Sequence, residues 1–212
     1  MTMLTDPTVP CTRSEMTLTF LPWPNEHLDV LGHDARSPYA ERFWLGVIGP
    51  SCLWLLRSIA YGFEASPDGF ETAVADLAGA LGLGDRCGQN SPIQKALVRL
   101  GRFGLAYPVA DDMFRVPCRL GWVDSLMLQR LPAGLAQTHD QWIAAFDAEH
   151  PDETTHRQAF AAVAALHRRG VTPEQLIPIL NRTCPDRVLA DRLVEWARTT
   201  PSPKGPVNVD LA

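Results

Sequence analysis

The chain has 212 residues, 20% of them charged, and a formal net charge of −5, which is typical of a globular protein of one or two small domains. No run of 18 apolar residues occurs, so the sequence predicts no membrane-spanning helix. Residues 1–16 lack the basic and apolar regions of a signal peptide. The five cysteines form no CxxC pair, which favours reduced thiols. We therefore expect a cytoplasmic protein.

Charge is unevenly distributed along the chain. Residues 1–83 carry four basic and ten acidic side chains, whereas residues 84–122 carry six basic and three acidic ones. Residues 123–212 are again acidic, with nine basic and eleven acidic side chains. The only net-positive segment is thus 84–122, and it is the natural candidate for contact with an anionic partner. Arginine outnumbers lysine 17 to 2, a bias typical of a GC-rich genome of the actinobacterial type.

The first elements follow from proline, glycine and capping signals. Residues 1–36 are rich in proline and lack periodicity, which predicts an extended, partly disordered N-terminal arm whose later part lies across the folded body. Two largely apolar helices are predicted at 38–48 and 50–63, separated by Gly49-Pro50. A turn at 66–69 then precedes a very short strand at 70–72.

Two helices and a hairpin are predicted next, and the second helix and the hairpin lie within the basic segment. A helix is predicted from 73 to the glycines at 82–84, and a second at 91–104, capped by Ser91 and started by Pro92. Alternating residues on either side of 110–112 then predict a hairpin over 105–119. Each of its strands contains a proline, which indicates an exposed, edge-like hairpin.

The rest of the chain is predicted to be helical. A helix over 124–146 should bend near Pro132, and further helices should end near Arg169, begin at Thr172-Pro173, and run from 184–186 to about Arg198. Residues 200–212 are predicted to be a disordered tail. The fold class is therefore mainly α with a small β-hairpin: a domain at 37–122, followed by a C-terminal helical region at 123–199.

The order of helix, short strand, two helices and hairpin resembles winged helix-turn-helix proteins of the bacterial transcriptional-regulator kind. The resemblance covers about residues 38–122 and rests on element order and on 73-AVADLAGALGLG-84. It implies a winged helix-turn-helix domain whose third helix, 91–104, enters the major groove of double-stranded DNA while the hairpin 105–119 acts as the wing. It also implies a role in transcription regulation.

The predicted third helix has two clearly different faces. At 100° per residue, the apolar side chains fall on one arc and the amide and basic side chains on the other. Gln, Arg and Val can contact adenine, guanine and the thymine methyl respectively, and the first helical turn can hold a phosphate. The hypothesis of base and backbone contact therefore names these residues: Gln89, Asn90, Ser91, Gln94, Lys95, Val98, Arg99, Arg102, Arg115 and Arg119. A merely solvated polar face is the alternative.

The hairpin tip favours a second hypothesis. Asp111 and Asp112 would be repelled by phosphates, and the loop at 84–90 is long. A protein-binding adaptor on the same fold would use this acidic wing and the C-terminal helices to bind a component of the transcription or replication machinery. Short amphipathic helices in the C-terminal half also need packing partners. The partner is either the winged-helix domain or the same region of a second subunit in a homodimer, which is common among regulators that read two half-sites.

Motifs for other chemistry do not emerge. The six histidines show no HxxxH or HExxH spacing, and no GxSxG, GxxxxGK[ST] or strand-anchored GxGxxG occurs. The carboxylates are scattered along the chain. We therefore expect no catalytic residue, cofactor or metal, and no enzyme.

Overall fold

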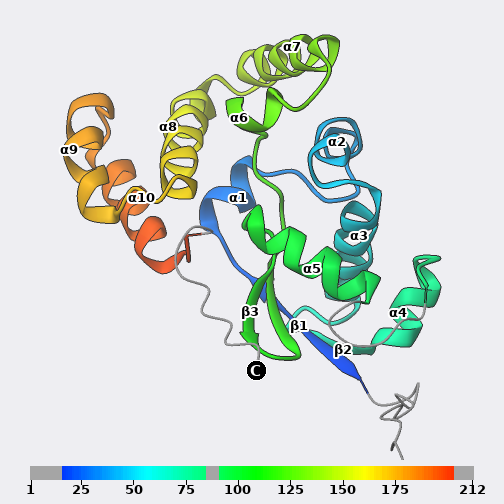
Figure 1. The fold of residues 1–212 in the computed structure, drawn as a ribbon. Coiled ribbons are helices and arrows are strands. Elements are labelled where there is room, and N and C mark those ends of the chain that lie inside the picture. The colour runs from blue at the N-terminus through cyan, green and yellow to red at the C-terminus, as the bar shows by residue number, and fades with distance from the viewer. Residues whose placement is uncertain (1–15, 85–90, 203–212) are drawn as a thin grey trace, which may run out of the picture.

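The computed structural model describes residues 16–84 and 91–202 (Figure 1). Most of them are helical, and one small sheet has the strand order β2-β1-β4-β3. The strands are β1 (Thr17–Trp23), β2 (Phe70–Ala73), β3 (Tyr107–Ala110) and β4 (Met113–Pro117). The helices are α1 (Glu26–Leu31), α2 (Leu45–Ile48, preceded by the π-helical turn η1, Ala40–Trp44), α3 (Pro50–Ala65), α4 (Val74–Ala80), α5 (Pro92–Arg102), α6 (Ser125–Leu128), α7 (Ala133–Glu149), α8 (Pro151–Arg168), α9 (Pro173–Thr183) and α10 (Arg187–Thr199). The mainly helical fold class is confirmed.

The N-terminal segment contributes more to the fold than the sequence predicted. Residues 16–36, expected as an extended arm across the body, form the central strand β1 and the helix α1. β1 runs antiparallel to β2 and parallel to β4, and its Leu18 and Phe20 are 2% and 0% exposed. The strand is therefore part of the main core. The rest of the predicted arm, residues 1–15, lies outside the described residues.

The main core lies between the sheet and the helices that cover one of its faces. α5 lies across the sheet in Figure 1, and its apolar residues join Phe20 of β1 and Phe114 of β4 in one buried cluster with α3. The predicted break between the first two helices is confirmed at Gly49, whose φ of +85° is a conformation that glycine adopts without strain. Near this break, Arg99 of α5 donates a hydrogen bond to the Val47 carbonyl of α2.

The sheet differs from the predicted arrangement of a short strand and a hairpin. The elements α3, β2, α4, α5, β3 and β4 occur in the predicted order, and β3 pairs antiparallel with β4 as a hairpin. However, β1 lies between β2 and β4, so β2 does not pair with the hairpin. A distant segment fills the centre of the sheet because its alternating apolar side chains match the core face of both neighbouring strands.

The C-terminal helices build a second core. The predicted bend near Pro132 is confirmed: α6 ends at Leu128 and α7 begins at Ala133. The first core continues past residue 122, because Leu131 and side chains of α7 pack into it. A separate buried cluster joins α8, α9 and α10 with Leu31 of α1. Residues 203–212 of the predicted tail lie outside the described residues.

Candidate nucleic-acid interface and a neighbouring cavity

Helix α5 presents the basic face that the sequence predicted. Its apolar residues, Ile93, Ala96, Leu97 and Leu100, are at most 4% exposed and point into the main core. Lys95, Val98, Arg99 and Arg102 are exposed on the opposite side, and Gln94 is half-buried at its edge. Within the described part of the chain, no carboxylate pairs with the three cations of this face. Among the described residues, the positive charge of this face is therefore not neutralised by an ion pair.

The start of α5 is a structural cap. Ser91 is 3% exposed, and its hydroxyl oxygen accepts a hydrogen bond from the Gln94 backbone N–H at 3.0 Å. This is the usual role of an N-cap serine, and it uses the hydroxyl that the phosphate-contact hypothesis needed. Gln89 and Asn90 lie outside the described residues.

Arg99 has a second role within the protein. Its Nη2 donates a hydrogen bond to the Val47 carbonyl at 3.1 Å, which satisfies a free carbonyl near the end of α2.

A further cation that the sequence analysis did not single out lies at the other end of the face. Arg130 is exposed, and its guanidinium lies 5.8 Å from the centre of the Phe103 ring, at the C-cap of α5. Only the folded chain brings Arg130 there, because the whole hairpin separates it from α5 in the sequence.

The two arginines predicted for the wing do not join this face. Phe114 and Val116 of β4 point into the core that α5 covers, so Arg115 between them points from the opposite face of the sheet. Arg119 lies beyond the end of β4, and its Nη1 donates to the Gly32 carbonyl at 3.1 Å. Both side chains are exposed, but the structure brings neither together with the basic residues of α5.

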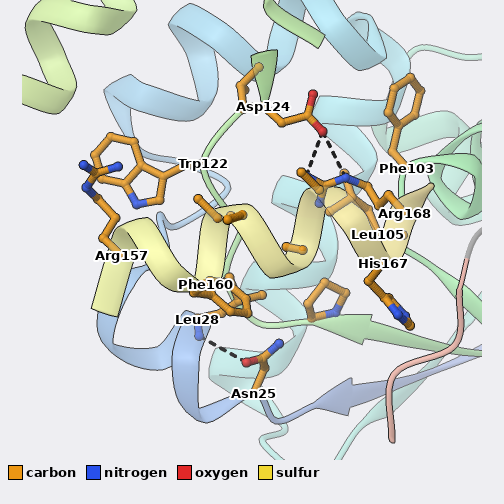
Figure 2. Close-up of a pocket in the computed structure, with 18 of the residues that line it drawn as sticks. Asn25, Leu28, Phe103, Leu105, Trp122, Asp124, Arg157, Phe160, His167 and Arg168 are labelled. Carbon is orange, nitrogen blue, oxygen red and sulfur yellow. Dashed lines mark hydrogen bonds and ion pairs between the residues drawn. The ribbon is translucent and has the colours of Figure 1, made fainter. Parts of the chain in front are cut away.

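A cavity of about 390 Å³ lies between the main body and α8. Figure 2 shows α8 crossing it, with Arg157 beside Trp122 at one end and Arg168 beside Asp124 at the other. Its walls come from β1, β3, the segment after β4, α7, α8 and α10. No sequence motif predicted this cavity, because its lining residues are spread from Trp23 to Thr200.

Two ion pairs anchor α8 at the ends of the cavity. Arg168 donates to Asp124 at 3.2 and 2.8 Å, and Arg157 donates to both carboxylate oxygens of Asp147 at 2.7 and 2.6 Å. The Arg157 guanidinium also lies 5.5 Å from the centre of the Trp122 ring. Both cationic groups in the lining are therefore neutralised by carboxylates within the protein.

The two histidines of the lining are held neutral. Burial lowers the pKa of His139 and also that of His167, because the charged imidazolium loses its hydration. His139 Nε2 lies 2.8 Å from the Tyr39 hydroxyl, and His167 Nε2 lies 2.9 Å from the Thr200 carbonyl. Within the part of the chain that the structure describes, each ring has a hydrogen-bond partner at one nitrogen.

Comparison of the chain with protein-family models, with curated proteins and with solved structures finds no match. In the described ranges, no helix is both long and apolar enough to cross a membrane. Those ranges also contain no group of three or more His, Cys, Asp or Glu side chains placed to hold a metal ion.

Proposed function

We propose that the protein is a DNA-binding regulator that contacts double-stranded DNA through the exposed face of α5. The observation that carries the proposal is the stripe of Lys95, Arg99 and Arg102 on one face of a helix whose opposite face is firmly buried. A rigid helix with cations at this spacing suits a major groove and its flanking phosphates. The winged helix-turn-helix resemblance, with its third helix at this position, supports the same assignment.

The Ser91 cap and the Arg99 contact refine the role of each residue. Lys95 and Arg102 are the phosphate and base contacts of the proposal, and Arg130 extends the positive surface beyond the end of α5. Arg99 contributes charge while it stays attached to the Val47 carbonyl. Arg115 and Arg119 are left out of the DNA-contacting set in this proposal, because they lie away from this face.

The test is DNA binding by a Lys95→Ala/Arg102→Ala variant. Both residues are exposed, so the fold should persist. Binding to a pool of genomic fragments should weaken by about tenfold or more, and the dependence of log K on log salt should become shallower by about two, because two phosphates would no longer be neutralised. The matched control is Arg169→Ala/Arg182→Ala, which removes the same charge from exposed positions elsewhere. Equal binding by the parent and the Lys95/Arg102 variant would refute the proposal.

The acidic hairpin tip supports a second candidate, a protein-binding adaptor. Asp111 and Asp112 are exposed beside β3, which is an edge strand of the sheet. An edge strand offers free backbone groups to a partner. A photo-cross-linking amino acid at position 111 should then capture one protein in nuclease-treated lysate, and Asp112→Lys should abolish that capture. If the tip faces DNA instead, Asp112→Lys should strengthen DNA binding.

A further inference from the structure

We propose that the cavity beneath α8 is a binding site for a small, uncharged aromatic molecule. The inference goes beyond DNA binding and does not depend on it. A volume of about 390 Å³ is within the usual range for small-molecule sites. Three features support the assignment: the small side chains that α8 places along the cavity, the aromatic side chains that form its walls, and the balance of its charges.

Alanines on α8 create the space. The residues of α8 that line the cavity are Arg157, Phe160, Ala161, Ala162, Ala164, Ala165, His167 and Arg168, so half of them are alanines. The two arginines at its ends are fixed by ion pairs, and the alanines between them leave space that larger side chains would occupy.

The walls are rich in aromatic side chains. Phe103, Trp122 and Phe160 are labelled around α8 in Figure 2, and Trp23 and Tyr107 add an edge-to-face pair with ring centres 4.1 Å apart. Aromatic rings pack best against another flat ring, stacked or edge to face. A planar aromatic molecule therefore fits this lining better than a flexible chain of similar size.

Charge balance favours an uncharged ligand. The Arg157 and Arg168 guanidinium groups are already paired with Asp147 and Asp124. A ligand carboxylate would have to displace one of these internal partners and would meet the exposed Asp140 at the rim. An anion would therefore lose its hydration without gaining a free cation.

Polar ring atoms of the lining residues contribute little to ligand recognition. His139 Nδ1, His167 Nδ1 and Trp196 Nε1 have no hydrogen-bond partner among the described residues, but all three atoms are fully buried and do not reach the surface of the cavity. The other nitrogen of each histidine is occupied by the Tyr39 hydroxyl and by the Thr200 carbonyl.

A ligand in the cavity therefore meets mostly ring and methyl surface. A phenol or an indole, each with one polar group on an aromatic ring, is the simplest probe of this class, because its polar group can point to the open side of the cavity while the ring packs against the walls.

The experiment uses phenol and indole as probes and benzoate as the charged comparison, with the full-length protein and no DNA. Saturation-transfer NMR and calorimetry should detect binding of phenol or indole, and benzoate should bind at least tenfold more weakly. Ala161→Phe fills the cavity and should weaken probe binding at least tenfold. Ala145→Phe, the same change at an exposed position of α7, should leave it unchanged.

A second variant covers the risk that Ala161→Phe fails to fold. Ala165→Leu adds less volume on the same side of α8 and should weaken binding in the same direction. The proposal is overturned if neither phenol nor indole binds, if benzoate binds as well as they do, or if both folded cavity variants retain the affinity of the parent.

Discussion

Protonation of His27 and of His33 is unfavourable in the folded protein, because both rings lose hydration there. Burial lowers the pKa of His27 and of His33 to about 4 each, and His156 further disfavours a charge on His27. His27 Nδ1 lies 2.8 Å from His156 Nε2, so one neutral ring donates to the other. His33 stacks on Tyr39 with ring centres 3.7 Å apart. These side chains act as aromatic core residues in their neutral form.

Acid should therefore destabilise the protein between pH 6.5 and 4. In this window the unfolded histidines bind protons that the folded ones do not, so the free energy of unfolding falls as the pH falls. His33→Phe keeps the ring but removes the titration, and should reduce the loss over this window by roughly 2 kcal/mol, allowing for partial exposure of His33. Urea denaturation at several pH values measures this. The exposed His150→Phe variant is the control, and equal pH dependence in parent and His33→Phe would contradict the argument.

At the scale of elements, close approach between α3 and β2 depends on a missing side chain. A Cβ added at Gly62 would lie 2.2 Å from Phe70 Cε1, whereas a Cβ at Gly79 of α4 would meet nothing within 4 Å. Phe70 in turn packs edge to face on Phe63 and against Phe20. Besides its pairing with β1, the short edge strand β2 is thus held to the body by one aromatic ring that packs against a glycine.

Two glycine substitutions should therefore have opposite effects. Gly62→Ala forces Phe70 to move and should destabilise the fold by about 1–3 kcal/mol, the usual cost of overpacking. Gly79→Ala should stabilise it by about 0.5–1 kcal/mol, because alanine favours a helix interior and the space is open. Thermal and urea unfolding of both variants measure the difference. A Gly62→Ala variant as stable as the parent would show that Phe70 has room to repack.

At the scale of the whole molecule, a small set of polar interactions joins the two cores. Besides packing, the α8–α10 unit is attached to the body by three ion pairs, Arg157 with Asp147, Arg168 with Asp124 and Arg192 with Glu26, and by the His27–His156 pair. The Asp124–Arg168 pair is more enclosed than the Arg192–Glu26 pair, with side chains 13% and 25% exposed. It joins α8 to the cap of α6, because Asp124 also accepts from the Met127 N–H.

Arg168→Ala should loosen this attachment while leaving the cap of α6 in place. We expect a loss of about 1–2 kcal/mol in the stability of the α8–α10 unit, since a half-buried carboxylate loses its partner. Hydrogen exchange should quicken in α8–α10 and stay unchanged in the sheet. The neighbouring, exposed Arg169→Ala is the matched control. Uniform acceleration across both cores would show instead that they unfold as one unit.

The sequence by itself determined most of the helices and their ends. Local signals suffice there: Ser91 caps α5, Pro50 starts α3, and Thr172 with Gln175 forms a capping box for α9. Each of these helix-start signals depends only on residues within one helical turn. The 3.6-residue repeat of a helix was also enough to predict the buried and exposed faces of α5, because this repeat is the same whatever the helix packs against.

Only the tertiary structure decided the sheet and the cavity. Residues 17–23 contain a proline and resemble an irregular arm, but their pairing with β2 and β4 makes them a central strand. Likewise, nothing near Ala161 indicates that it lines a cavity together with Trp122, and nothing near Arg115 shows that its side chain points away from α5. Strand pairing and cavity walls join residues that are far apart along the chain, so no local pattern carries that information.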